Sequence, residues 1–192
     1  MIIGASGVGK TSIIQRISPV YVPSDTTRRP RPGEIDGVDF FFLTNYGQVV
    51  ADIESGRFVQ VAVGASGDLY ATRASSYPNY GIATMPVMAG VIPLFRELGF
   101  KATISAFITP PSYEEWMRRM GSHNLGEEQV KRRLIEARQS FGFALSDQQT
   151  HFILNDDLAT AVGQTTDLLN GKTDSKEESL AKTAAEKILK KL

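Results

Sequence analysis

The stretch Gly4-Ala5-Ser6-Gly7-Val8-Gly9-Lys10-Thr11 decides the fold class of this chain. It matches the phosphate-binding loop pattern in full, with an apolar stub before it and an apolar-faced helix expected after it. Glycines let successive backbone N–H groups approach phosphate oxygens without a Cβ in the way. Lys10 is expected to reach the β- and γ-phosphates of ATP, and the Thr11 hydroxyl to ligate Mg²⁺. The spacing therefore predicts a chain that binds a nucleoside triphosphate.

Strand-like and helix-like segments alternate through most of the remaining chain. Strands are predicted over residues 82–87, 102–109 and 152–154, and helices over residues 112–120, 130–145 and 158–170. Ser112 is the expected N-cap of one of these helices, and the run Asn155-Asp156-Asp157 is expected to cap another. This alternation predicts an α/β fold in which a P-loop parallel sheet is sandwiched by helices. Residues 20–82 instead show short β-like runs broken by Gly and Pro, which predict an inserted mixed-β arm.

The predicted organisation has a core, an arm, a lid and a tail. We expect the core over residues 1–24 and 83–170, a monophosphate-binding arm over 25–82, a helical lid over 117–133 and a charged tail over 171–192. In the tail, Leu180, Ala184, Ile188 and Leu192 recur every four residues. This spacing favours an amphipathic helix packed on the body over a membrane or partner anchor.

Composition excludes several classes of protein. Of the 192 residues, 42% are apolar and 22% are charged, which is typical of a globular domain. Lys+Arg and Asp+Glu are both 21, so overall charge gives no reason to expect nucleic acid or an acidic membrane as partner. Cysteine is absent, which excludes disulfides, thiolate catalysis and Cys-ligated zinc. We therefore expect a cytoplasmic protein with no nucleic-acid or membrane partner.

A second cluster of cations lies in residues 24–34, Ser-Asp-Thr-Thr-Arg-Arg-Pro-Arg-Pro-Gly-Glu. The two prolines disfavour helix, so Arg28 and Arg31 can converge on one anion from an extended loop. The planar guanidinium group suits bidentate contact with phosphate. A solvated basic loop is the alternative, but the phosphate-binding loop in the same chain favours a second phosphate site.

Over about residues 1–170 the sequence resembles the guanylate kinase family. Residues 24–34 match the family's Ser-x-Thr-Thr-Arg-x-Pro-Arg-x-Gly-Glu run, and residues 35–42 resemble the x-Asp-Gly-x-Asp-Tyr-x-Phe element that follows it. Residues 66–70, 108–115 and 155–158 resemble three further conserved-pattern stretches of that family. The resemblance implies a P-loop kinase that phosphorylates a nucleoside monophosphate.

The resemblance also implies roles for individual side chains of the arm. Arg28, Arg31 and Tyr70 would grip the phosphate of the monophosphate, with Ser24 and Thr72 at the base of the site. The full set of residues implied in monophosphate binding is Ser24, Arg28, Arg31, Phe40, Gln60, Tyr70 and Thr72.

Four positions depart from the family pattern. Phe40 stands where the family has a phosphate-contacting Tyr, which removes one hydroxyl. Gln60 stands where a Glu accepts hydrogen bonds from guanine, and an amide offers one acceptor oxygen beside a competing NH₂ group. We therefore expect the preference for guanine to weaken or change. Met85 and Val87 occupy the places of aspartates near the metal.

The lid is expected to supply further cations. Arg119 and Arg133 match family arginines that bridge the two nucleotides, while Trp116 is expected to pack the lid helix rather than stack on a base. Phosphoryl transfer needs in-line positioning and cations around a dispersed negative charge. The predicted catalytic set is Lys10, Arg28, Arg119 and Arg133, with Mg²⁺ bound by Thr11 and ATP.

The leading prediction is a phosphotransferase that moves the γ-phosphoryl group of ATP to a nucleoside monophosphate, and GMP is the expected acceptor. One alternative is a catalytically weak guanylate-kinase-like module that binds nucleotides or a protein. Another is a kinase for a different phosphorylated acceptor, such as a sugar phosphate. The chain is expected to act as a monomer or a homodimer.

Overall fold

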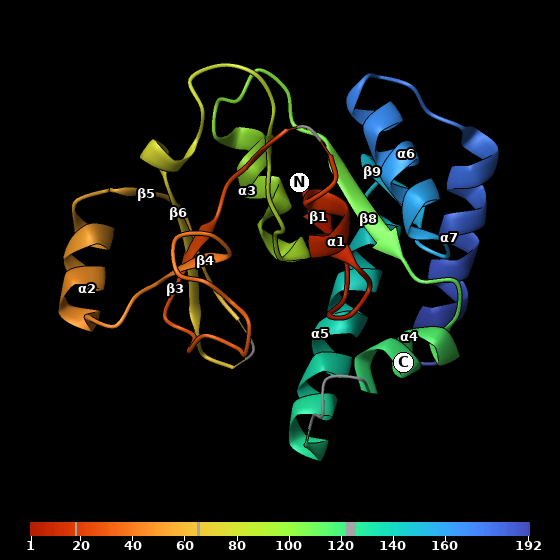
Figure 1. Cartoon of the computed structure of the whole chain (residues 1–192), viewed down its shortest axis with the longest axis horizontal. Coiled ribbons are helices and arrows are strands. Elements are labelled where there is room, and N and C mark those ends of the chain that lie inside the picture. Colours follow the sequence, from red (N-terminus) through yellow and green to blue (C-terminus); the bar gives the residue numbers. More distant parts are fainter. Residues whose placement is uncertain (18, 65, 122–125) are drawn as a thin grey trace. The chain divides into compact units, whose positions relative to one another are not determined.

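The computed structural model describes residues 1–17, 19–64, 66–121 and 126–192 (Figure 1). The chain divides into two compact units. The first unit comprises Met1–Ser18, Pro86–Arg96 and Phe100–Leu192, and the second comprises Pro19–Met85 and Glu97–Gly99. None of the helices in the described ranges combines the length and apolar character that a bilayer crossing requires.

The first unit is built on a parallel sheet. Its strands are β1 (Ile2–Ile3), β8 (Ser105–Thr109) and β9 (Thr150–Leu154), in the order β1-β8-β9. Both pairings are parallel, and an isolated parallel bridge joins Ile2 to Pro86 on the other side of β1. Every residue of β8 is buried because helices cover both faces of the sheet. The predicted parallel sheet of an α/β fold is thereby confirmed.

Helices cover the two faces of this sheet in pairs. On one face lie α5 (Glu127–Ser146) and α7 (Ser175–Leu189), which pack against each other. The ring of Phe107 in β8 meets that of Phe141 in α5, with centroids 4.8 Å apart. On the other face, α1 (Lys10–Ile14) packs against α6 (Leu158–Leu169). The remaining helices of the first unit are α4 (Tyr113–Gly121), the 3-10 turn Ala89–Val91 and α3 (Ile92–Glu97), whose last residue belongs to the second unit.

Two helix starts follow the capping chemistry expected from the sequence. The hydroxyl of Ser112 accepts a hydrogen bond from the backbone N–H of Glu115 at 3.1 Å. The carboxylate of Asp157 accepts one from the N–H of Thr160 at 2.8 Å and is the N-cap of α6. Each cap satisfies a backbone donor that the first helical turn leaves unpaired. The Ser112 cap is confirmed, and within the run 155–157 the structure assigns the cap to Asp157.

The second unit contains a mixed four-stranded sheet. In sheet order its strands are β4 (Phe40–Phe42), β3 (Ser24–Thr26), β6 (Leu69–Arg73) and β5 (Phe58–Val63). The β3–β4 pair is parallel and the other two pairs are antiparallel. A separate parallel pair joins β2 (Val20–Tyr21) to β7 (Ala83–Thr84), and residues Ala74–Ser76 form a 3-10 turn. The predicted β-rich character of this segment is confirmed.

One helix of the second unit was not expected. Helix α2 (Tyr46–Glu54) lies in a segment that reads as β-like runs and loops. The side chain of Asn45 caps it by accepting a hydrogen bond from the N–H of Gln48 at 3.1 Å. Val49 and Asp52 are its buried residues. The neighbouring β-branched valines obscure the helical spacing, whereas the Asn45 cap was the available signal.

The charged tail forms α7, and its buried face differs in part from the expected apolar stripe. Leu180 is 57% exposed, whereas Ala181 and Ala185 are fully buried. Ile188 is common to the expected and the observed stripe. The small side chains of Ala181 and Ala185 let the backbone of α7 lie close to its neighbours. Close packing therefore turns these alanines, rather than Leu180, toward the core.

Candidate functional site

The phosphate-binding loop leaves β1 in a conformation that requires glycine. Gly4, Gly7 and Gly9 have φ values of 143°, 82° and 96°. A Cβ on Gly9 would overlap the side-chain amide nitrogen of Asn155, and one on Gly4 would lie 2.8 Å from the carbonyl oxygen of Ile108. The glycines are therefore needed for backbone angle and for close approach alike.

Protein donors hold the carbonyl oxygens of this loop. The Lys10 ammonium donates to the carbonyls of Gly4 and Ala5, at 2.7 and 2.8 Å. The indole N–H of Trp116 donates to the carbonyl of Ser6 at 2.8 Å, and the Asn155 amide donates to that of Val8 at 2.7 Å. Because these carbonyl oxygens are fixed by the protein, the direction of the backbone N–H groups between them is fixed too. The loop is thus shaped before an anion arrives.

The Thr11 side chain offers an oxygen for a cation. Thr11 lies in the first turn of α1 and is exposed. Mg²⁺ commonly keeps several waters and takes few protein ligands when it is bound with a nucleotide, so one hydroxyl beside phosphate oxygens fits this ion. Within residues 1–17, 19–64, 66–121 and 126–192, His, Asp and Glu form no group of three that could hold a metal by themselves.

Helix α4 places Arg119 beside the loop. Its Nε donates to Glu115 at 2.7 Å, and its NH1 donates to the backbone carbonyl of Asn155 at 2.8 Å. Together with Arg118, Arg119 lowers the pKa of Glu115 to about 2. Arg133 lies half-buried in α5. Residues 122–125 of the predicted lid lie outside the described residues.

The strand register brings the expected monophosphate-binding side chains to one face of the second sheet. Directly paired residues share a face, and so do alternate residues along a strand. The pairs that fix the face are Ser24–Phe40, Thr26–Tyr70 and Gln60–Thr72. Ser24, Phe40, Gln60, Tyr70 and Thr72 therefore all lie on the same face, although they come from β3, β4, β5 and β6.

Arg28 lies over the aromatic part of this face. Its guanidinium carbon is 5.1 Å from the centroid of the Phe40 ring and 5.8 Å from that of Phe42. Its NH2 donates to both carboxylate oxygens of Glu34, at 2.9 Å each. Arg28 Nε is buried and has no hydrogen-bond partner in the described part of the chain. Arg28 therefore reaches the expected face, but an acidic neighbour already binds it.

Arg31 is placed differently. Its side chain is exposed, and its backbone N–H donates to Glu34 at 2.7 Å. Glu34 thus binds Arg28 through a side chain and Arg31 through the main chain. The two guanidinium groups do not converge as expected. That of Arg28 binds a carboxylate, and that of Arg31 faces solvent.

The base of this face includes a residue that the sequence did not single out. The Tyr77 hydroxyl lies 3.1 Å from the hydroxyl of Thr72 and 3.4 Å from the sulfur of Met85. Burial raises the pKa of Tyr77. Gln60 is buried, and its amide nitrogen donates to the carbonyl of Tyr70 at 3.4 Å. Tyr77 follows the 3-10 turn after β6, and no sequence motif indicated that it would return to Thr72.

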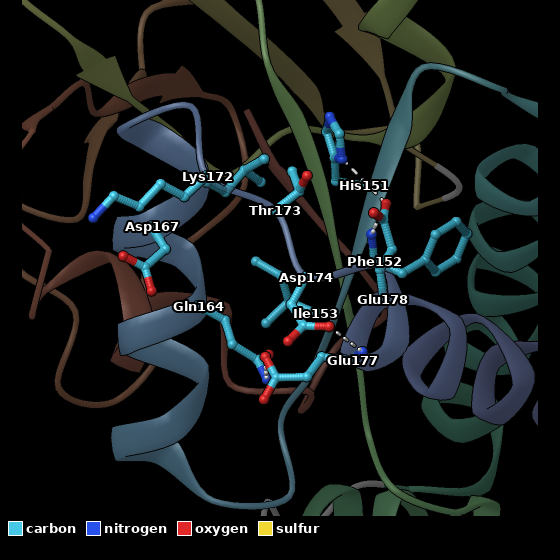
Figure 2. A pocket seen from close by; sticks show the side chains of 11 residues that line it. His151, Phe152, Ile153, Gln164, Asp167, Lys172, Thr173, Asp174, Glu177 and Glu178 are labelled. Atoms are coloured by element: carbon cyan, nitrogen blue, oxygen red, sulfur yellow. Dashed lines mark hydrogen bonds and ion pairs between the residues drawn. The ribbon is translucent and has the colours of Figure 1, made fainter.

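A cavity of about 210 Å³ lies elsewhere in the first unit, among β9, α6 and α7 (Figure 2). Several of its polar side chains are paired with one another or with the backbone. His151 contacts Glu178 at 3.1 Å, and Gln164 donates to Glu177 at 2.9 Å. Asp174 caps α7. The observed contact of His151 is thus an ion pair or hydrogen bond with Glu178 of α7.

A glycine-shaped phosphate loop between the first strand and first helix of a parallel sheet defines a P-loop protein. A second sheet, inserted after the first helix, presents a separate polar face with an arginine over it. The family within that class follows from comparison with known proteins.

The chain belongs to the guanylate kinase family. The family profile, described as guanylate kinase, matches residues 1–80. The chain is 33% identical over 181 residues to a guanylate kinase of Wolbachia pipientis wMel, covering 86% of this chain and 85% of that one. It is 31% identical over 187 residues to a guanylate kinase of Corynebacterium glutamicum, covering 88% and 92%. A crystal structure of guanylate kinase from Anaplasma phagocytophilum has the same fold, with a TM-score of 0.67 at 20% identity over 99% of this chain and 92% of that one.

Proposed function

We propose that this chain transfers the γ-phosphoryl group of ATP to GMP, giving ADP and GDP. The observation that supports this most is the register of the second sheet, which gathers Ser24, Gln60, Tyr70 and Thr72 on one face. Relatives that match most of the chain are named guanylate kinase. We place the reaction in the cytoplasm, as the bacterial relatives suggest.

ATP binds in residues 4–11 in this proposal. The β-phosphate accepts hydrogen bonds from backbone N–H groups of the loop and lies at the N-terminal end of α1. Lys10 exchanges the carbonyls of Gly4 and Ala5 for the β- and γ-phosphate oxygens. The Thr11 hydroxyl would hold Mg²⁺, and this ion would neutralise negative charge on the phosphates of ATP.

GMP binds on the face of the second sheet. Its phosphate lies near Arg28, Arg31 and Tyr70, with Ser24 and Thr72 below it. The buried Arg28 Nε is a donor that phosphate can satisfy. The base lies near Gln60, whose amide nitrogen is engaged by Tyr70, so the amide oxygen is the acceptor that this side chain presents to guanine.

Transfer needs no protein nucleophile. The GMP phosphate oxygen attacks the γ-phosphorus directly, and the bond to the β,γ-bridging oxygen breaks, which leaves ADP. Arg119 and Arg133 stabilise the charge that spreads over the equatorial oxygens, together with Lys10 and Arg28. Positioning and cations thus supply the catalysis.

Met85 supports a second candidate, a nucleotide-binding module with weak catalysis. Met85 is 3% exposed and lies against Tyr77, where the family has an aspartate near the metal. A buried thioether offers no hard oxygen ligand, so any help from this position in ordering Mg²⁺ is lost. This candidate predicts ATP and GMP binding with little turnover.

The deciding experiment is a phosphoryl-transfer assay of the full chain with GMP, AMP, CMP, UMP and a sugar phosphate as acceptors. We expect turnover with GMP, lost in Lys10→Ala because the cation that bridges the β- and γ-phosphates is removed. ATP binding without turnover on any acceptor would support the weak module instead. Turnover with only the sugar phosphate would reject both candidates.

A further inference from the structure

We propose that Trp116 is a positioning residue for the phosphate-binding loop and couples this loop to helix α4. Its indole N–H donates to the carbonyl oxygen of Ser6 at 2.8 Å, across 110 positions of sequence. The side chain is fully buried. This role goes beyond the packing expected of the residue, and it rests on the proposed function only in taking residues 4–11 as the ATP site.

The hydrogen bond acts on the peptide between Ser6 and Gly7. The Ser6 carbonyl and the Gly7 N–H belong to the same planar unit, so holding the oxygen fixes the direction of the N–H. Gly7 has a φ of 82° and no Cβ, so little else in its own backbone resists a flip of this peptide. The indole therefore keeps the Gly7 N–H in the direction that a phosphate oxygen needs.

The indole itself cannot easily move. Its ring centroid lies 6.0 Å from that of Phe141 in α5 and 5.9 Å from that of Tyr113 in α4. Phe141 in turn packs on Phe107 of β8. The donor is thus anchored in the core of the first unit, where ring packing limits its rotation.

Helix α4 contacts the loop at a second point. A Cβ on Gly7 would lie 3.6 Å from the Cα of Met120, one turn after Trp116. The same helix carries Arg119, which donates to the Asn155 carbonyl, and the Asn155 amide donates to the Val8 carbonyl. A displacement of α4 would therefore disturb the Ser6 and Val8 carbonyls together. Nucleotide in the loop should stabilise α4, and with it the position of Arg119.

The first test is Trp116→Phe, which keeps an aromatic ring and removes the N–H. We expect the dissociation constant for ATP·Mg²⁺, measured by titration calorimetry on the full chain, to rise on the order of threefold to tenfold, the range of one neutral hydrogen bond. The KM for GMP should stay unchanged. Tyr113→Phe is the matched control, because it removes a hydroxyl from the same helix and leaves the Ser6 bond in place.

A merely structural role gives a different result. In that case Trp116→Phe lowers the melting temperature but binds ATP as tightly as the wild-type chain, and the proposal is rejected. A wild-type chain that binds no ATP at all rejects the proposed function as well, so the two failures are distinguishable.

The second test uses the wild-type chain and needs no variant to fold. The sequence contains a single tryptophan, so the proton NMR spectrum of the protein has one indole N–H resonance. We expect ADP·Mg²⁺ to shift this resonance and to slow its exchange with solvent, and GMP alone to leave it in place. An indole signal that ignores ADP·Mg²⁺ at saturation would overturn the proposal.

Discussion

Gly9 is the residue at which backbone angle and close packing limit the chain most directly. Its φ is 96°, and a Cβ there would overlap the Asn155 amide that holds the Val8 carbonyl. The left-handed region costs a non-glycine residue about 1–2 kcal/mol even without a clash. A methyl group at this position therefore disturbs both the start of α1 and the donor behind the loop.

We expect Gly9→Ala to lower the free energy of unfolding by about 1–3 kcal/mol and to abolish ATP binding. Gly142→Ala is the matched control, since Gly142 lies within α5 and nothing lies within 4 Å of the added methyl. Alanine in a helix interior is neutral or stabilising there. Thermal unfolding and ATP titration check both variants; an unchanged ATP affinity in Gly9→Ala contradicts the loop geometry.

Gln60 is the residue at which base preference should be adjustable. Gln60→Glu supplies two acceptor oxygens to the guanine N1–H and amino group. We expect kcat/KM for GMP relative to AMP to rise about tenfold, at some loss of stability without ligand, because the bond to the Tyr70 carbonyl is lost. Gln60→Leu should lower the same ratio. If kcat/KM for GMP relative to AMP is equal in the wild-type chain and both variants, the guanine base does not contact Gln60.

At the scale of elements, an ion-pair network ties the second sheet to α2. Arg73 in β6 donates to Asp25 in β3 and to Asp52 in α2, at 2.8 Å each. The Asp25 and Asp52 side chains are 1% and 4% exposed. Asp25 and Arg73 alternate with Ser24 and Thr72 along β3 and β6, so the network holds the sheet from the face opposite the proposed GMP site.

We expect Arg73→Met to destabilise the second unit by about 3–5 kcal/mol, because it leaves two buried carboxylates without their common cation. Arg57→Met is the matched control: Arg57 binds the same Asp52, but its side chain is 62% exposed, so its loss should cost less than about 1 kcal/mol. Denaturant unfolding measures both. Equal effects would mean that burial of the pair is unimportant.

A pH effect is expected where α3 meets the loop before β9. Two hydrogen bonds from Arg96, at 3.0 and 2.6 Å, lower the pKa of Asp147 from 3.8 to about 2. A lowered pKa in the folded state stabilises the fold above the ordinary pKa, and this contribution is lost as pH falls toward the lowered value. Asp147→Asn should therefore flatten the decline of unfolding free energy between about pH 4 and pH 2. Arg96→Gln should do the same, and a slope unchanged in both variants would contradict this assignment.

At the scale of the whole molecule, each nucleotide should protect its own unit. Hydrogen exchange of the full chain with ATP·Mg²⁺ is expected to slow in residues 4–14, and with GMP in β3 and β6, because a ligand stabilises the state that binds it. In Lys10→Ala the ATP effect should vanish and the GMP effect remain. Protection of residues 4–14 by GMP alone would contradict the assignment of the two sites.

Local chemistry explains what could be predicted from the sequence. The phosphate loop follows from glycine spacing, the helix starts from Ser112 and Asp157, and the parallel sheet from alternating elements. That Ser24, Gln60 and Tyr70 belong to one site is predicted only by the family resemblance, and no local pattern indicates it. The contacts that no local pattern indicated are those between distant positions, such as Trp116 with Ser6 and Tyr77 with Thr72.

The errors also have physical causes. Helix α2 is not predicted because its valines favour strand over helix. The buried face of α7 differs in part from the expected one because Ala181 and Ala185 are buried and Leu180 is exposed. The Arg28–Glu34 pair spans a proline-rich loop, where spacing along the chain gives no information about which side chains meet.

We expect the Arg28–Glu34 pair to weaken the binding of small anions by the second unit. Chloride, acetate or free phosphate would have to displace a tethered carboxylate whose effective concentration is far above theirs. In the proposed site GMP also contacts Gln60 and Tyr70, and we expect these contacts to outweigh the bond between Arg28 and Glu34. Glu34 thus competes with common ions of the solution for Arg28, and we expect only an acceptor with further contacts to replace it.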